Sequence, residues 1–428
     1  MLEERLSIPS KTSNRFFMLI GLGLVLLIIG VFITMNSAGH QAEGHGGGHG
    51  EAAAAAAGGH HAITWVNRLF ANLWLNNVFF TGIAVVGLFF AAVQYVAYAG
   101  WSVPVKRILE SLTAYLPVGA IVMLVVFLVG KHQLFHWTDE SLYEVGNANY
   151  DPILAGKSGF LNQPFYLIRM VVYFGAWIFF AWWLRKQSLN EDLNGGLEYY
   201  HRSIRISAMF LVVFGVTSSM SAWDWVMSVD PHWFSTLYGW YVFASWFVSG
   251  LAATTLTAIY LKQHGYLKIL NANHLHDLGK FIFGFSIFWT YLWFSQFMLY
   301  WYANLPEEVG YFQERLHGYN NHYTWILFTN LILNFAFPFL VLMTRDAKRQ
   351  MIMLKLVCIV VLIGHWMDFY LMIMPGTLRG ESGFGLMELG VLLVFLGTFL
   401  TLITRRLSSA TLIPVNHPFL EESVHHTV

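Results

Sequence analysis

The sequence predicts an all-α integral membrane protein, and three observations lead to this fold class. Hydrophobic residues make up 56% of the 428 residues, whereas Asp, Glu, Lys and Arg together make up only 11%. A soluble domain usually carries about 25% charged residues. The chain also contains ten continuous apolar runs, each near the length of about 20 residues that a helix needs to cross a bilayer. Such runs differ from the short alternating segments of a transmembrane β-barrel.

The ten runs predict ten transmembrane helices, separated by polar segments. The first run follows three basic residues, as a signal peptide does, but it is longer than the apolar core of a typical signal peptide, so we expect a retained helix. The runs lie near residues 16–35, 77–99, 114–130, 165–184, 204–222, 236–261, 280–303, 322–344, 353–374 and 386–404.

Basic residues set the expected orientation, because Lys and Arg collect in the cytoplasmic loops of membrane proteins. Of the 24 Lys and Arg residues, 18 lie in the segments on the side of the N-terminus and six lie in the alternate segments. We therefore expect a multi-pass protein of a cell membrane with both termini in the cytoplasm. The side of the termini is called inner below, and the other side outer.

Composition also excludes several classes of function. Acidic and basic residues are equal in number, which argues against nucleic-acid binding, because nucleic acids need a basic surface. Cys358 is the single cysteine, so the chain cannot supply the thiolates of an iron–sulfur cluster, a cysteine-based zinc site or a haem c attachment. We expect no metal site and no covalently bound cofactor, and any redox chemistry needs a small molecule or a partner's centre.

A low-complexity segment rich in His, Gly and Ala follows the first run at residues 38–61. Its histidines can bind a metal ion adventitiously, but nothing in the pattern fixes the geometry that a selective site needs. We favour a flexible, solvated outer linker. The histidines are His40, His45, His49, His60 and His61.

Ionisable residues inside a membrane span are costly, so each one is a candidate functional residue. His365 and Asp368 lie deep in the ninth run, three residues apart and therefore on one helix face. An imidazole and a carboxylate in series can relay protons; the alternative is a buried pair that locks neighbouring helices together. Asp230, after the fifth run, and Glu388, in the tenth, are further candidates for the same proton pathway.

A second group of candidates lies toward the outer side and suggests contact with a quinone. Asp224 sits among tryptophans at the end of the fifth run, where a carboxylate can accept protons from a quinol hydroxyl. Arg169, in the fourth run, can hold that carboxylate or contact a quinone oxygen. His132 and His232 lie near the same boundary. The alternatives are an interfacial aromatic belt and ordinary capping or ion pairing.

A faint internal repeat suggests how the helices are grouped. Asp224 and Asp368 are each followed by an aromatic residue and, seven residues after the Asp, by a proline; the two sites are four runs apart. This pattern predicts two four-helix bundles flanked by one helix on each side. The expected divisions are 1–37 with the first helix, 38–70 as the linker, 71–225 and 226–380 as the two bundles, and 381–428 with the last helix and a cytoplasmic tail.

Polar residues in the seventh and eighth runs are expected mainly to hold helices together. Asn330 and Asn334 are one turn apart in the eighth run. We expect interhelical hydrogen bonds from them rather than a proton wire.

Three strings in the sequence point to a known family. LNQPFYLIR stands in the fourth run, WDWVMSVDPHWFST at the end of the fifth, and HWMDFYLMIMP in the ninth. With these strings and the 1+4+4+1 arrangement, residues 75–405 resemble the NrfD-like family (polysulfide reductase membrane subunit). Within that family the chain is most similar to the second, ActF-type subunit of alternative complex III.

The resemblance implies a subunit without a redox centre in a quinol:electron acceptor oxidoreductase of a bacterial inner membrane. Implied partners are an iron–sulfur subunit, haem c subunits, a sister NrfD-like subunit, small membrane subunits and a terminal oxidase. The non-protein ligands that it implies are lipids and menaquinone or another quinone.

The resemblance also assigns residues to roles. It implies a quinol-type pocket region at His132, Arg169 and Asp224, and a proton route through His365 and Asp368. Catalytic quinol binding usually belongs to the sister subunit. The expected function is therefore proton translocation, with quinone binding as a secondary expectation.

Two other classes of membrane protein were weighed. A stand-alone secondary transporter also has repeats and ionisable residues in mid-membrane, but its helices are usually broken there by Gly or Pro. The prolines here stand mostly at helix ends, with Pro338 as an exception. A haem b protein needs two histidines at similar depth on facing helices, and only His365 lies deep.

Overall fold

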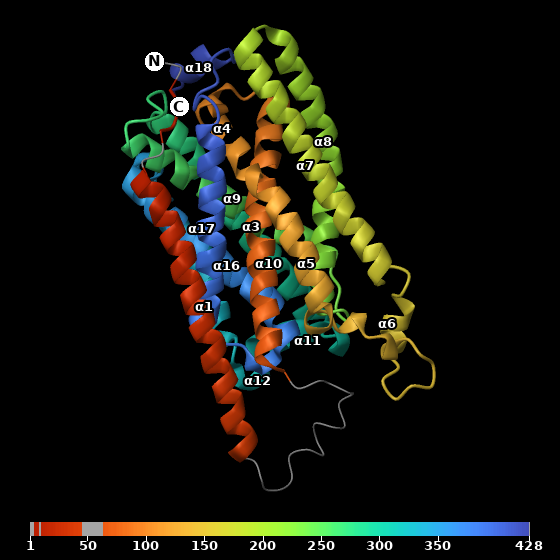
Figure 1. Ribbon diagram of the computed structural model, residues 1–428. Coiled ribbons are helices and arrows are strands. Elements are labelled where there is room, and N and C mark those ends of the chain that lie inside the picture. The colour runs from red at the N-terminus through yellow and green to blue at the C-terminus, as the bar shows by residue number, and fades with distance from the viewer. Residues whose placement is uncertain (1–3, 8–9, 45–62, 428) are drawn as a thin grey trace.

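The computed structural model describes residues 4–7, 10–44 and 63–427. Within these ranges the chain is helical, with ten spans long and apolar enough to cross a membrane and one isolated β-bridge between Arg5 and Thr411. The predicted fold class, a multi-pass α-helical membrane protein, is confirmed. Both termini lie at one end of the molecule (Figure 1). We call this end the terminal face and the other end the opposite face.

Each span coincides with one of the apolar runs. Short helices lie in the connections: α6 (Pro152–Gly156), α11 (Pro306–Leu316), α12 (Gly318–Asn321), α15 (Arg345–Arg349) and α18 (Leu420–Val424). The spans are α1 (Ser10–Gly44), α3 (Trp65–Val96), α4 with α5 (Val103–Leu112 and Leu116–Leu134), α7 (Gln163–Asn194), α8 (Leu197–Trp225), α9 (Tyr238–Gln263), α10 (Ala272–Ala303), α13 with α14 (Thr324–Leu331 and Phe337–Val341), α16 (Met351–Leu378) and α17 (Leu386–Ser408).

The predicted linker, 38–70, is shorter than expected. Helix α1 continues to Gly44 and α3 begins at Trp65, so both ends of that range are helical. The sequence contains no proline there, and its Ala, Gln and Glu residues favour a helix. Residues 45–62 lie outside the described residues, and they include His45, His49, His60 and His61. The expectation about metal binding by this segment therefore stays a prediction.

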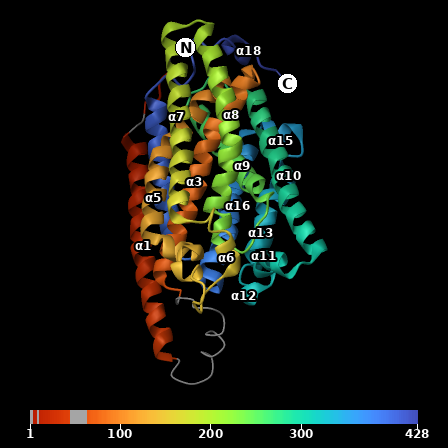
Figure 2. The same ribbon diagram turned by 90° about the vertical axis from the view of Figure 1, so that its right-hand side faces the viewer.

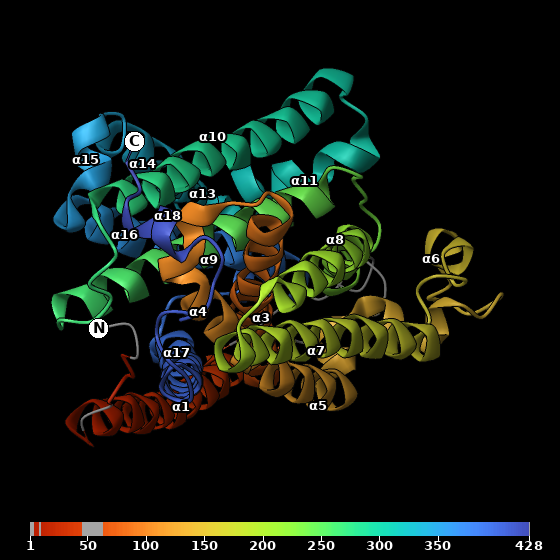
Figure 3. The ribbon, with the colours of Figure 1, turned by 90° about the horizontal axis from the view of Figure 1, so that it is seen from above.

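Helix α3 forms the centre of the molecule. It packs against α4, α5, α8, α9, α16 and α17, and Figure 3 shows it inside the ring of other helices. Its buried asparagines make contacts across helices: Asn77 donates to the carbonyl of Gly119 at 2.9 Å, and Asn76 accepts from Trp366 at 3.0 Å. The two predicted bundles, α3 to α8 and α9 to α16, meet along α3, α9 and α16. Their division into separate units stays a prediction.

Helices α1 and α17 pack closely along their length at one side of the molecule (Figure 3). Glycines make this approach possible. A Cβ atom at Gly23 would lie 2.7 Å from the carbonyl oxygen of Gly390, and one at Gly397 would lie 2.6 Å from Ile20. Small residues at a helix contact let backbones approach in lipid, where packing rather than the hydrophobic effect holds helices together.

Candidate functional site

Asp368 lies inside α16 and is fully buried, at the meeting point of four helices. Its carboxylate accepts four hydrogen bonds. The hydroxyls of Tyr241 and Ser245, both on α9, donate to it, the latter at 2.5 Å. The indole of Trp289 on α10 and the amide of Asn330 on α13 also donate, each at 2.9 Å. All four donors are neutral, and within the described residues no Lys or Arg forms an ion pair with Asp368.

His365 lies one turn before Asp368 on the same helix face, as the spacing predicts. Its Nδ1 atom is 3.9 Å from a carboxylate oxygen of Asp368, and its ring stands edge-on to Trp289 with centroids 5.5 Å apart. The side chain is fully buried. Neither ring nitrogen has a hydrogen-bond partner among the described residues. His365 is thus a buried base beside a carboxylate, with both nitrogens available for proton exchange.

The eighth span is interrupted beside this pair. Its two α-helical parts are joined by a π-helical turn, Ile332–Ala336, which contains the buried Asn334. The amide of Asn334 donates to Asn330 at 2.6 Å, so Asn334, Asn330 and Asp368 form a chain of hydrogen bonds. The oxygen of Asn334 and the hydroxyl of Ser286 on α10 are buried without a protein partner in the part of the chain described. Single π-turns occur often at functional sites.

Tyrosines connect Asp368 toward the opposite face. Tyr241, which donates to Asp368, lines a cavity of about 20 Å³ together with Tyr238, Tyr311 and Arg315. This volume is enough for one water molecule. The hydroxyls of Tyr238 and Tyr311 lie 3.3 Å apart. Burial raises the pKa of Tyr311, in the connecting helix α11, to about 12, so this phenol keeps its proton at neutral pH.

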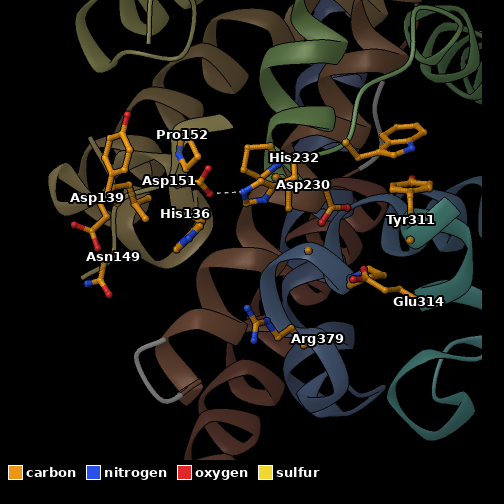
Figure 4. A pocket seen from close by; sticks show the side chains of 18 of the residues that line it. His136, Asp139, Asn149, Asp151, Pro152, Asp230, His232, Tyr311, Glu314 and Arg379 are labelled. Atoms are coloured by element: carbon orange, nitrogen blue, oxygen red, sulfur yellow. Dashed lines mark hydrogen bonds and ion pairs between the residues drawn. The ribbon is translucent and has the colours of Figure 1, made fainter. Parts of the chain in front are cut away.

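A larger polar cavity of about 670 Å³ opens at the opposite face (Figure 4). It is lined by Asp151, Asp230, His232, Tyr311 and Glu314, among others. Burial raises the pKa of Glu314, and the nearby charge of Asp230 adds to this shift. Because Tyr311 lines both cavities, this cavity adjoins the tyrosine path from Asp368.

Asp230, a predicted proton-pathway residue, lies at the edge of the polar cavity and is paired with Arg315 at 2.9 Å. Arg315 is buried and also donates to the backbone carbonyls of Tyr311 and Leu371, each at 2.9 Å. The arginine therefore ties the loop after α8 to α11 and α16. No sequence pattern pairs these two residues, which are 85 positions apart.

Glu388, the other predicted pathway residue, lies in a different place. It accepts two hydrogen bonds from Arg68 on α3, at 2.6 and 2.8 Å, and one from Asn72 at 3.0 Å. It also accepts a bond from the backbone N–H of Gly385 at 2.8 Å, at the start of α17. These contacts hold α3 and α17 together. None of these contacts joins Glu388 to His365 or Asp368.

The four quinone candidates do not form one pocket. Arg169 donates twice to Asp224, both bonds at 2.8 Å, and Tyr173 donates a third at 2.8 Å. Neither Arg169 nor Asp224 lines the cavities at the opposite face. His232 lies in the polar cavity, where its Nε2 atom is 2.5 Å from Asp151 (Figure 4). His132 lines an adjacent cavity of about 610 Å³ and contacts the hydroxyl of Thr138 at 3.2 Å.

Asp224 and Asp368, the two equivalent positions of the repeat, differ in charge compensation. Asp224 is held by a guanidinium, Arg169, whose own face packs on the rings of Phe160 and Phe165 at 3.9 and 4.2 Å. Asp368 has only neutral donors. Protonation of Asp224 would leave a buried arginine without its counter-charge, which is costly. Protonation of Asp368 would instead remove a buried charge.

Sequence reasoning did not identify the donors to Asp368 on α9. One signal was present: Tyr238, Tyr241 and Ser245 recur at intervals of three and four residues, which places them on one helix face.

Comparison with known proteins adds no family assignment: no family model matches the sequence, and no curated protein matches it.

Proposed function

We propose that this chain is a proton-translocating membrane subunit of a quinol-oxidising respiratory complex in a bacterial inner membrane. The observation that carries the proposal is the environment of Asp368, a carboxylate in the middle of a buried span with four neutral donors and no Lys or Arg partner. A buried ionisable group of this kind is costly to maintain, and such groups mark proton relays in membrane proteins.

The proposed path has an inner and an outer part. On the inner side, His365 exchanges protons with Asp368, and the unpartnered polar atoms of Asn334 and Ser286 lie on the helices that pack around it. On the outer side, Tyr241, Tyr238 and Tyr311 lead to the polar cavity with Glu314. Each hydroxyl can accept one proton and donate another, so the path needs no redox centre in this chain.

The resemblance of the sequence to the NrfD-like subunits of alternative complex III supplies the proposed partners. Electrons from a quinol would pass to iron–sulfur and haem c subunits, beside a sister NrfD-like subunit, small membrane subunits and a terminal oxidase. Quinone contact by this chain is a weaker part of the proposal, because the four candidate residues are distributed over three places.

The test uses the complex purified through a tag on this chain and reconstituted in vesicles. We expect iron–sulfur and haem c subunits to accompany the chain. In Asp368→Asn, quinol oxidation should continue, whereas the number of protons released per electron should fall by half or more. Asp346→Asn, an exposed carboxylate in α15, is the matched control. An unchanged proton-to-electron ratio in Asp368→Asn would contradict the proposal.

A secondary transporter is the second candidate, favoured by the π-turn that interrupts the eighth span beside Asp368. Broken helices form the binding sites of many transporters. A chain that purifies alone and without haem, and that takes up a solute in an Asp368-dependent way, would support this candidate instead.

A further inference from the structure

An aromatic groove lies along α9, and none of the residues that line it donates to Asp368. Residues of α8, α9 and α10 line it, together with the C-terminal end of α3 and Trp101. Figure 2 shows α9 lying between α8 and α10. Its volume is about 1080 Å³. Ten of its nineteen lining residues are Phe or Trp, and their distribution over four helices makes it continuous along the bundle.

Glycines keep this groove open. Gly215 on α8 and Gly284 on α10 both line it, and a Cβ atom at either would meet nothing within 4 Å. These glycines therefore do not serve close packing of helices, unlike Gly82, where a Cβ would collide with Trp246. The groove faces the region that hydrocarbon chains occupy around a membrane protein.

Charge is confined to one end of the groove. Among the described residues that line it, the charged ones are Lys280 and Asp277, which lie 2.7 Å apart where the apolar part of α10 begins. The side chain of Lys280 is 51% exposed. Lys348 lies close by, with its ammonium 4.7 Å above the ring of Phe283. The backbone beside Lys280 also lies close to Lys348, since a Cβ atom at Gly279 would lie 3.0 Å from the Cβ atom of Lys348.

Trp101 lies beside the charged end of the groove. Its indole stacks on Phe281, with centroids 6.0 Å apart and planes at 20°. Tryptophan and lysine together are typical of the headgroup level of a bilayer. With α15 included, the cations Lys280, Lys348, Arg345 and Arg349 outnumber the carboxylates Asp277 and Asp346, so the end is complementary to an anion.

We infer that the groove binds an anionic phospholipid, with its phosphate at Lys280 and an acyl chain along the phenylalanines. A lipid has one charged end and an apolar remainder, as the groove has. At its other end the groove has two small polar residues, Ser218 and Ser219, and no charged residue within the described part of the chain, so it offers a charged partner at one end only. This inference does not rest on the proposed function.

The test measures lipid retained by the purified protein. The full chain is exchanged into micelles with equal amounts of dioleoyl phosphatidylglycerol and dioleoyl phosphatidylcholine, and retained lipids are counted by native mass spectrometry. We expect phosphatidylglycerol to be retained in preference. One lysine near a headgroup changes the binding constant about fivefold, so Lys280→Gln should reduce the preference by about that factor. Lys268→Gln, an exposed lysine away from the groove, should not.

A second variant tests the groove itself. Gly284→Leu fills it and should remove the retained lipid, whereas Gly175→Leu, at an equally open and exposed glycine on α7, should retain it. Both changes replace a glycine within a helix, so folding should tolerate them equally. Equal retention of the two lipids, or unchanged retention in Gly284→Leu, would overturn the inference. Release of a co-purifying membrane polypeptide by Gly284→Leu would also overturn it and identify a partner helix as the occupant.

Discussion

The predicted repeat relates Asp224 to Asp368, and replacing each by asparagine should affect stability very differently. In Asp224→Asn, Arg169 loses the negative charge that receives two of its bonds, both 2.8 Å long. Breaking a buried ion pair by removing one partner costs about 3–5 kcal/mol. Arg169 keeps its bond to the carbonyl of Phe160 at 3.0 Å, which places the expected loss near the lower limit.

In Asp368→Asn the carboxamide keeps one acceptor oxygen. The hydroxyls of Tyr241 and Ser245 can rotate and accept a bond instead of donating one. One N–H group, of Trp289 or Asn330, then loses its acceptor, at a cost of about 1–3 kcal/mol. Removal of a buried carboxylate charge that no Lys or Arg among the described residues compensates offsets part of this cost. A loss near 3 kcal/mol against one of about 1–3 kcal/mol, part of which is offset, makes Asp224→Asn the less stable variant, by up to about 2 kcal/mol plus the offset.

The chain contains a convenient probe for this comparison. Cys358 is its only cysteine and is fully buried in α16, so a thiol-reactive dye labels the protein only when this region opens. Labelling during heating should begin at a clearly lower temperature in Asp224→Asn than in Asp368→Asn or the Asp346→Asn control. The reasoning on charge compensation would be refuted if labelling began at the same temperature in both variants, or at a lower temperature in Asp368→Asn.

Two further predictions use the same labelling assay. Burial, and then the charges of Lys106 and Arg107, lower the pKa of His417 to about 2, so the folded protein keeps this imidazole neutral while the unfolded chain protonates it below about pH 6.5. Stability should therefore fall as the pH decreases from 6.5, by up to about 1.4 kcal/mol per pH unit from this group. His417→Gln should make the stability less dependent on pH in this range. An identical slope in the variant and the unchanged protein would contradict the prediction. Glu388→Gln should lower stability by about 1–3 kcal/mol because Arg68 loses its counter-charge at the contact of α3 and α17, whereas Glu381→Gln, at an exposed position, should have no effect.

The number and type of spans were predictable because each helix is encoded locally. Ten continuous apolar runs correspond to ten helices, since a span in lipid has to satisfy its own backbone hydrogen bonds. The approach of His365 to Asp368 was equally predictable, because a spacing of three residues fixes a common helix face. The ends of the connection between α1 and α3 were not predictable, because the helix boundaries there depend on weak helix propensities rather than on an apolar pattern.

The contacts of the candidate site depend on how helices are rotated against one another, which no single run specifies. Tyr241 and Asp368 are 127 positions apart, and Arg315 and Asp230 are 85 apart. The same limitation affected the quinone candidates. Arg169 and Asp224 do pair, but His132 and His232 face separate cavities, because proximity to the outer boundary does not determine which way a side chain points.

The packing of α1 on α17 has a consequence for biogenesis. The ribosome makes α1 before the other nine spans and α17 after them, so the main helical partner of α1 is the last to arrive. During synthesis α1 has to reside in lipid as a single helix. Its composition suits that interval, because few residues of its apolar segment are buried in the finished protein. Docking of α1 through the glycines of both helices then depends on the synthesis of α17.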